Sequence, residues 1–371
     1  MESKKPIRVL MIGMHDKIGG VETFLMNYLR NINREEVIFD FISTFKELCF
    51  EEEIIKLGGK VYHICSEKKN PFKYCKDLKK IIKQNNYSIV HINMLSAANI
   101  LPVLVSKMVK VKHIIVHSHN SNVPAGVLRK ILNFVNKPFL HLATNFYACS
   151  IKAGEWLYGK RFLKKHELVL INNAIDLEKY SFNDEDRENI RKELDISDKF
   201  VVGNIGRFSY QKNHEFLIDV FYEIQKQKEN SVLLLIGEGE LEEEIKKKIE
   251  NLNIMEKVIF LGTTSAVGKY LQAMDVFVLP SRFEGLGIVA IESQVSGLKT
   301  FVSDVVPSEA EVTELLEKIS LNESAYHWSE KIINDCIVND RKKQDEKIGE
   351  MGFDIKIESI ILQNRYIEMV K

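Results

Sequence analysis

The sequence lacks the features that mark secreted and membrane-spanning proteins. Its 371 residues include five cysteines, an odd number, and none has the Cys-x-x-Cys or Cys/His spacing of a metal site or redox motif. No apolar run approaches the roughly 18 residues that a membrane-spanning helix needs. The first apolar run, in "MESKKPIRVLMIGMHD", is too short for a signal peptide. We therefore expect an intracellular protein with reduced structural thiols.

Acidic residues are scarce in the first half of the chain. From residue 68 to 165 there are 18 basic residues, and only Asp77 and Glu155 are acidic. Residues 1–176 hold 27 basic and 15 acidic residues, a charge of +12, and residues 177–371 balance this with −12. A basic half indicates an anionic partner, either a nucleic acid or a membrane surface. The alternative is that lysine-rich helices only solvate the surface.

The basic stretches favour a membrane over a nucleic acid. "LYGKRFLKKH" at 157–166 and "SKMVKVKH" at 106–113 mix cations with apolar residues, as helices on anionic bilayers do. Nucleic-acid binding would favour stacking aromatic residues or a known module, and the sequence offers neither. We expect a cytoplasmic protein associated peripherally with the inner face of the membrane, and no nucleic-acid partner.

Short apolar runs alternate with segments of helical period along the whole chain. "IRVLMIGM" and "YSIVHINM" are two of the runs in the first half, and "FVVGNIGRF" and "DVFVLP" are two in the second. This rhythm predicts an α/β protein with parallel sheets covered on both faces. We expect two doubly wound, Rossmann-like domains that face each other across a cleft.

The expected domain boundaries follow from composition. A polar, charged stretch at 177–199 interrupts the rhythm and is interpreted as a connector with no buried face beyond one short helix. We place the first domain at 1–176 and the second at 177–352. Residues 353–371 have a helical period, with no clear strand after them, and could form a terminal helix that packs back on the first domain.

The most informative stretch is "LPSRFEGLGIVAIES", residues 279–293. An apolar strand ends at a glycine turn, and a helix is expected to begin near Gly287. Free backbone N–H groups and the helix dipole would suit a phosphate there. Glu284 precedes the helix and Glu292 lies in its second turn, so both can reach one hydroxyl-bearing ligand. The alternative is one capping and one solvated glutamate, which the spacing alone does not separate.

Two further turns contain candidate ligand groups. In "GNIGRFSYQKN", Arg207 and Lys212 follow the first strand of the second domain, where two cations could bind a diphosphate and stabilise a leaving group. They could equally be ordinary surface cations. In "GMHDKIGGVETF", Gly19 and Gly20 precede a helix and form a second turn of the phosphate-binding type.

His119 ends the strand of "HIIVHSHN" and is a candidate polar catalytic residue, the alternative being a structural histidine.

Two partial motifs carry less weight. "GEGELE" at 237–242 has Glu242 where a dinucleotide fingerprint has its third glycine, so it is weak evidence for an oxidoreductase. "DED" at 184–186 is a literal Asp-x-Asp metal motif, but it lies in the charged connector and is interpreted as solvated.

Together these motifs resemble retaining glycosyltransferase family 4, which has the GT-B architecture. The resemblance spans nearly the whole chain and includes "GGVET", "HSHN", "INNAID", "GRFSYQKN" and, above all, "FEGLGIVAIE", the E-x(7)-E element of that family. Among members, it is most similar to bacterial enzymes that build capsular or exopolysaccharide repeat units. The resemblance implies transfer of a hexose or N-acetylhexosamine from a nucleotide sugar, most often a UDP-sugar, to a glycan or polyprenyl-diphosphate-linked acceptor.

The resemblance also implies roles for individual residues. Arg207 and Lys212 would contact the diphosphate, Glu292 the ribose, and Glu284 the donor sugar. His119 would lie near the reacting sugar. The backbone at the donor would come from Gly19, Gly20, Gly285, Leu286, Gly287 and Ile288. No metal or other cofactor is expected, because two cations and a helix dipole supply the positive charge.

The sequence departs from the family pattern at two places, and two other functions stay open. "SDVVPSEAEVT" has Pro307 where many members have a Gly-Gly turn, and Ala174 follows Asn173 where many have Asn-Gly.

A nucleotide-sugar-binding protein without transfer activity would keep the same donor residues. A dinucleotide-dependent oxidoreductase is the second alternative.

Overall fold

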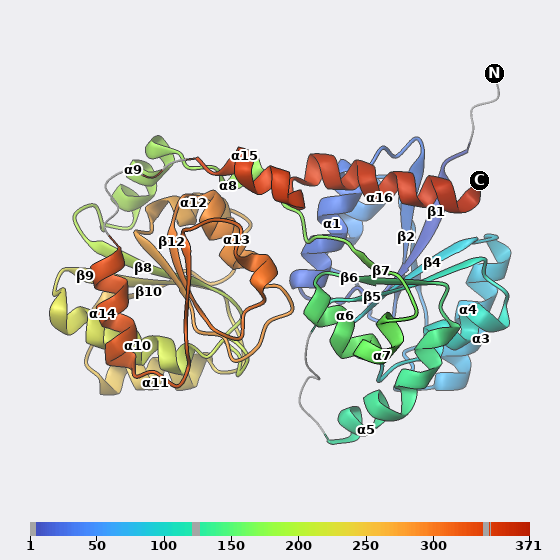
Figure 1. Ribbon diagram of the computed structural model, residues 1–371, viewed down its shortest axis with the longest axis horizontal. Coiled ribbons are helices and arrows are strands. Elements are labelled where there is room, and N and C mark those ends of the chain that lie inside the picture. The colour runs from blue at the N-terminus through green and yellow to red at the C-terminus, as the bar shows by residue number, and fades with distance from the viewer. Residues whose placement is uncertain (1–4, 121–126, 337–340, 342) are drawn as a thin grey trace. The chain divides into compact units, whose positions relative to one another are not determined.

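The computed structural model describes residues 5–120, 127–336, 341 and 343–371. The chain divides into two compact units (Figure 1). Unit 1 comprises Met1–Ile175 and Gly352–Lys371, and unit 2 comprises Asp176–Met351. Among the described residues, no helix is both long and apolar enough to cross a bilayer.

Unit 1 is built on a parallel sheet of seven strands in the order β3-β2-β1-β4-β5-β6-β7. Its strands are β1 (Ile7–Ile12), β2 (Val37–Ser43), β3 (Val61–His63), β4 (Ile89–Met94), β5 (His113–Ser118), β6 (Asn145–Ala148) and β7 (Leu168–Leu170). Its helices are α1 (Gly20–Asn31), α2 (Glu51–Lys56), α3 (Pro71–Gln84), α4 (Leu101–Met108), α5 (Val127–Asn136), η1 (Lys137–Leu142), α6 (Ile151–Tyr158), α7 (Lys160–Leu163) and, after unit 2, α16 (Ile355–Val370).

Unit 2 is built on a parallel sheet of six strands in the order β10-β9-β8-β11-β12-β13. Its strands are β8 (Phe200–Ile205), β9 (Ser231–Ile236), β10 (Val258–Phe260), β11 (Val276–Leu279), β12 (Lys299–Ser303) and β13 (Leu316–Ile319). Its helical elements are α8 (Leu177–Tyr180), α9 (Asp184–Glu193), α10 (His214–Gln227), α11 (Glu242–Asn251), η2 (Met255–Lys257), α12 (Val267–Ala273), α13 (Ile288–Val295), η3 (Ser308–Ala310), α14 (Ala325–Asp335), α15 (Asp345–Ile348) and η4 (Gly349–Phe353).

In each sheet, the order in which successive strands are added changes direction at one place. A ligand site is expected at this place. In unit 2 the order turns between β8 and β11, which are paired in parallel through Val276 and Val202. In unit 1 it turns between β1 and β4, where Val9 pairs with Ile89. Ligands of doubly wound sheets bind outside the carboxyl ends of the strands at such a switch point. The predicted doubly wound α/β fold is therefore confirmed in both units.

The strands are continuous apolar runs because both faces of each sheet are buried. On β1, Val9 and Met11 pack into one hydrophobic cluster, and Leu10 and Ile12 pack into the cluster on the opposite face. Parallel strands covered by helices on both sides require this composition. In unit 2 the largest buried side chain is Trp328, which packs with the helices and strands of that unit's core.

The C-terminal helix belongs to unit 1. α16 lies beside α1 and buries Ile355, Leu362 and Tyr366 in the unit 1 core (Figure 1). A short parallel bridge between Ile175 and Asp354 holds the start of the helix to the end of the first chain segment of the unit. The returning chain thus completes one face of the unit 1 sheet.

The stretch at 177–199, interpreted as a connector with no buried face beyond one short helix, lies in unit 2 and includes α9, whose buried residues are Ile190 and Arg191. Arg191 on α9 is only 7% exposed and donates to the Ala273 carbonyl at 2.8 Å. Arg187 contacts Asp275 at 2.5 Å. The charged composition concealed this, because both arginines pair with a carboxylate and carbonyls rather than with water. Asp184 and Glu185 remain exposed at the start of α9, away from these contacts.

Candidate active site

Two loops meet at the carboxyl ends of β8 and β11 in unit 2. The backbone N–H of Arg282 donates to the Gln211 carbonyl at 2.7 Å, and the Gln211 side chain donates back to the Phe283 carbonyl at 3.0 Å. Asn213, in the left-handed region at φ 57°, donates to the Pro280 carbonyl at 3.0 Å. These bonds fix "GRFSYQKN" and "PSRFEGLG" against each other, although 72 residues separate Gln211 from Phe283.

A nearly buried ion pair joins the two loops. Lys212 Nζ lies 2.8 Å from Glu284 Oε1, with the two side chains 16% and 6% exposed. Ser281 Oγ donates to the same carboxylate oxygen at 2.7 Å. The other oxygen lies 3.4 Å from Gln211 Nε2. An ion pair shielded from water in this way is strong and geometrically defined, so Lys212 and Glu284 act as one unit.

Helix α13 begins directly after this ion pair. Its N-cap, Gly287, adopts φ 83° and ψ 52°, the left-handed conformation that glycine tolerates best. A Cβ added there would lie 3.5 Å from Val306, so the backbone conformation and not the space demands glycine. The first backbone N–H groups of the helix, from Ile288 onward, have no carbonyl one turn earlier and favour an anion. Leu286 is buried beneath the turn, and Gly285 lies between it and Glu284.

Glu292 is buried one turn into α13. It is 4% exposed, and burial raises its pKa from 4.5 to about 7. A hydrogen bond from Tyr180 and the charges of Lys179 and Lys212 oppose this shift, because each favours the carboxylate. Lys212 therefore acts electrostatically on both predicted glutamates. A carboxyl that titrates near neutral pH is an unusual feature for a core helix and is typical of functional sites.

Arg207 does not join Lys212 in the structure. Its side chain is 64% exposed and pairs with Glu240 of the loop after β9, at 3.0 Å. The spacing in "GRFSYQKN" predicted two cations acting on one ligand; here they lie in the same loop but pair with different carboxylates. Sequence reasoning missed Glu240, because it occurs in a stretch with several glutamates and nothing distinguishes it from its neighbours.

The glycine turn of unit 1 lies at the start of α1, after β1. Gly20 is the first residue of α1, and a Cβ built on it meets no atom of the described chain within 4 Å. Gly19 precedes it in extended backbone. Glu22 is 3% exposed and accepts from the His15 backbone N–H at 3.0 Å, and burial raises its pKa. Glu22 is a buried carboxyl at this turn that the sequence analysis did not single out.

His119 ends a row of three histidines in unit 1. Its Nε2 lies 2.8 Å from Asn93 Oδ1, an acceptor, so Nε2 carries the proton and Nδ1, which is buried, has no partner among the described residues. Burial lowers the pKa of His119 to about 3, so the ring is neutral near pH 7. His117 stacks on it with ring centroids 4.0 Å apart. His91 then lies 3.1 Å from His117.

The row reaches the C-terminal helix. His91 Nδ1 lies 2.7 Å from the Tyr366 hydroxyl of α16. Side chains two residues apart on a strand point to the same face, and the rings of His117 and His119 accordingly lie side by side, tilted by 30°. Tyr366 could not have been predicted as a member, because 275 residues separate it from His91.

The region of the partial dinucleotide motif does not favour a dinucleotide. Glu242 is the first residue of α11 and pairs with Lys246 at 2.7 Å. A carboxylate at a helix start opposes a second anion at the same place. Gly237 and Gly239 instead allow close approach to the backbone of Gly206 and Phe208 in the loop after β8.

Two family models match the chain and together cover most of it. The model described as "Glycosyltransferase Family 4" matches residues 18–179, and the one described as "Glycosyl transferases group 1" matches residues 186–351. The boundary between the two matches falls close to the division between unit 1 and unit 2.

Curated relatives are similar over most of their length. The putative glycosyltransferase EpsF of Bacillus subtilis (strain 168) is 30% identical over 98% of this chain and 97% of its own. The UDP-Gal:alpha-D-GlcNAc-diphosphoundecaprenol alpha-1,3-galactosyltransferase of Escherichia coli is 26% identical, covering 79% of this chain and 78% of its own. The capsular polysaccharide biosynthesis glycosyltransferase CapH of Staphylococcus aureus is also 26% identical, covering 77% and 78%.

The fold is similar to that of solved structures. Anabaena Alr3699/HepE in complex with UDP aligns over 97% of this chain and 100% of its own, with a TM-score of 0.77 and 18% identity.

Proposed function

Since the chain belongs to glycosyltransferase family 4, we propose that it transfers a hexose or N-acetylhexosamine from a UDP-sugar to a glycan or polyprenyl-diphosphate-linked acceptor. The chain is a glycosyltransferase with the GT-B fold, related to enzymes of capsular and exopolysaccharide biosynthesis. The donor, the acceptor and retention of the anomeric configuration belong to the proposal. The relatives whose names include UDP or an undecaprenol diphosphate support it.

The observation that carries the proposal is the Lys212–Glu284 ion pair beside the start of α13. Loss of UDP from a sugar leaves negative charge on the β-phosphate. An ammonium held in place by Glu284 and the first backbone N–H groups of α13 would stabilise such a charge with little reorganisation. We propose that Lys212 and the N-terminus of α13 hold the diphosphate, with Arg207 closing on it when it exchanges Glu240 for the donor.

The two glutamates have different proposed partners. We propose that Glu284, in the turn before α13, accepts hydrogen bonds from hydroxyl groups of the sugar while remaining paired with Lys212. Glu292, one turn into α13, would accept hydrogen bonds from the vicinal hydroxyls of the ribose. Its pKa near 7 means that the acceptor form is only partly populated at neutral pH. We further propose that the reaction needs no divalent metal, because Lys212, Arg207 and the helix dipole supply positive charge at the diphosphate.

The groups in unit 1 have proposed roles of their own. Gly20 has the open backbone that a phosphate could approach, and we place neutral His119 near the reacting sugar. Both assignments are proposals. We also propose that the protein works at the cytoplasmic face of the membrane, where a lipid-linked acceptor resides, and that the basic half of the chain contacts anionic lipid.

A transfer assay with labelled UDP-sugars tests the function. We expect label to move to a lipid-extractable or glycan acceptor, and to do so equally well in EDTA. Donor binding without transfer to any acceptor would indicate a silent binding protein. A loss of activity in EDTA that Mg²⁺ or Mn²⁺ restores would refute metal independence alone.

A further inference from the structure

Helix α5 of unit 1 has its polar side against the protein and its apolar side against solvent. Asn133 is the only residue of α5 that is buried. Its Oδ1 accepts from the Ala97 backbone N–H at 2.9 Å. One turn later, Asn136 Nδ2 donates to the Ala98 carbonyl at 3.1 Å. The helix is thus anchored to the loop after β4 by amide side chains and not by a hydrophobic stripe.

The outward side of α5 is almost entirely apolar. Its exposed apolar residues are Val127 (76%), Leu128 (70%), Ile131 (53%), Leu132 (39%), Phe134 (79%) and Val135 (55%). At roughly 100° per residue, these six side chains span an arc of about 160° centred opposite Asn133. An amphipathic helix of a soluble protein normally presents the reverse arrangement. A contiguous apolar face of this kind marks a surface that something else covers.

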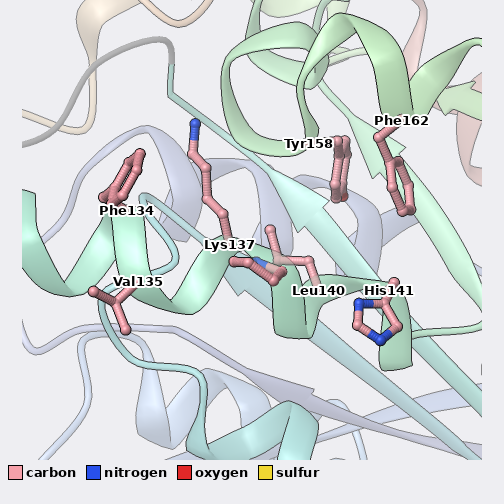
Figure 2. A pocket seen from close by; sticks show the side chains of 8 residues that line it. Phe134, Val135, Lys137, Leu140, His141, Tyr158 and Phe162 are labelled. Atoms are coloured by element: carbon pink, nitrogen blue, oxygen red, sulfur yellow. The ribbon is translucent and has the colours of Figure 1, made fainter.

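A pocket continues this face. Phe134 and Val135 of α5 line it together with Pro138 and Leu140 of η1, and Tyr158 and Phe162 of α6 and α7 close its other side (Figure 2). Its volume is about 560 Å³. Lys137 lies at the same pocket and donates to the Trp156 carbonyl. The pocket is therefore apolar and continuous with the exposed side of α5.

The charge around α5 indicates which kind of partner covers its apolar face. Arg129 and Lys130 are both exposed and flank the apolar arc. From residue 78 to 154 the sequence contains no Asp or Glu. A symmetric dimer through α5 would bring the same positive charge against itself, whereas anionic headgroups complement it. Long cationic side chains beside an apolar arc are typical of helices that lie in a bilayer interface.

We propose that α5 is the membrane-embedding element of this protein and that its occupant is an anionic lipid bilayer. The outward residues, centred on Ile131 and Phe134, enter the boundary between headgroups and acyl chains, and Arg129 and Lys130 contact lipid phosphates. A lipid hydrocarbon chain fills the pocket beside Phe134. This deepens the membrane part of the proposed function by naming the helix that makes the contact.

Vesicle flotation tests the proposal with matched variants. Ile131→Asp/Phe134→Asp places two charges on the α5 face. Ile357→Asp/Ile360→Asp is the control, since these residues have the same spacing, are 52% and 56% exposed, and lie on α16 at the opposite side of unit 1 (Figure 1). We expect wild type and control to bind phosphatidylglycerol vesicles, and the α5 pair to bind about tenfold or more weakly. Arg129→Gln/Lys130→Gln should lower the preference for phosphatidylglycerol over phosphatidylcholine by about tenfold.

UDP binding, measured on the same variants by thermal shift, separates this proposal from the transferase assignment. The α5 pair should keep wild-type UDP binding, and a wild-type melting temperature in the same assay shows that it is folded. Equal flotation of the α5 pair and the wild type would overturn the proposal, as would a wild type that binds no vesicles. A wild-type dimer that the α5 pair converts to monomers, with no vesicle binding, would assign the face to a second copy.

Discussion

At the residue scale, Lys212 is the side chain on which the proposed chemistry depends most directly. Lys212→Met removes the cation beside the diphosphate, and we expect kcat to fall by about 10²–10³-fold, the loss typical of removing one preorganised electrostatic group. It also leaves Glu284 without its partner, at about 1–3 kcal/mol of stability. Steady-state kinetics and denaturant unfolding measure the two effects.

Lys226→Met is the matched control for Lys212. Lys226 pairs with Glu223 on the exposed side of α10 at 2.8 Å, outside the loops at β8 and β11. We expect it to leave both kcat and stability close to wild type, because exposed ion pairs contribute little. If the two lysine variants have the same activity, Lys212 does not act on the reacting charge.

Glu292 gives the donor site a pH dependence. Its folded pKa of about 7 lies above the ordinary 4.5, so the protonated form is favoured in the folded state. Ribose hydroxyls donate to the carboxylate, and UDP affinity should therefore rise with pH through about 7. Glu292→Gln should weaken binding at pH 8 and remove this dependence. Calorimetric titrations of UDP from pH 5.5 to 8.5 measure it, and an unchanged pH profile in the variant would contradict the ribose assignment.

The raised pKa of Glu292 also makes the folding stability depend on pH, in the opposite direction to UDP affinity. The favourable contribution of protonated Glu292 is present below pH 4.5 and is lost as the pH rises through 7. Glu292→Gln should thus gain up to about 3 kcal/mol over wild type at pH 8 and little at pH 4.5. Glu250→Gln on the exposed side of α11 serves as the control for replacing a glutamate in unit 2. Together the two profiles would show a carboxyl kept for binding at a cost in stability.

At the element scale, the start of α13 combines a strained backbone with the anion site. Gly287→Ala forces an alanine into φ 83°, which costs about 1–2 kcal/mol. Gly159→Ala is the control, because Gly159 has φ 88° and nothing within 4 Å of an added Cβ, and it lies between α6 and α7. We expect both variants to lose stability, Gly159→Ala the more, because its ψ of 143° lies outside the left-handed helical region that alanine can enter. We expect weaker UDP binding only in Gly287→Ala. Equal UDP affinities in the two variants would show that the Gly287 turn does not contribute to donor binding.

The elements themselves were largely predictable from the sequence, and their side-chain partners were not. Apolar runs such as "DVFVLP" can only be parallel strands buried on both faces, and the glycine turn fixes where α13 begins. The order of the strands then brings "GRFSYQKN" beside "FEGLG". Local patterns could not predict that Lys212 pairs with Glu284 or that Arg207 pairs with Glu240, because these contacts depend on loop conformations. The sequence indicated one short helix at 177–199, but not that the charged Arg191 would be buried on it.

At the scale of the whole molecule, the returning helix α16 is required for unit 1. It buries Ile355, Leu362 and Tyr366, each no more than 1% exposed. Removing residues 353–371 would delete these three buried side chains and expose the part of the unit 1 core that they cover. The lost burial, about 1.5–3 kcal/mol for each side chain, is comparable to the stability of a whole domain. We expect the truncated chain to be insoluble or to unfold at a much lower temperature, as measured by soluble yield and thermal melting. A truncated chain with a wild-type melting temperature would refute this requirement.

The net charges of the two halves of the chain agree with the roles that we propose for them. The first half carries +12 and includes α5, the proposed membrane contact, and the second half carries −12 and includes the proposed donor site. Within the acidic half, we propose that Lys212 and the start of α13 bind the anionic donor locally, so that the net charge of this half does not decide donor binding. This is the arrangement we expect of a transferase that meets its donor in the cytosol and its acceptor at a membrane.

The most direct test of the account is transfer of labelled sugar from a panel of UDP-sugars to lipid extracted from the source cells, with wild type and Lys212→Met assayed side by side. The account predicts that wild type moves label from one UDP-sugar into a lipid-extractable or polysaccharide product, and that the variant moves about a hundredfold less. Undiminished transfer by the variant, or no transfer from any UDP-sugar by a wild type that binds UDP, would contradict it.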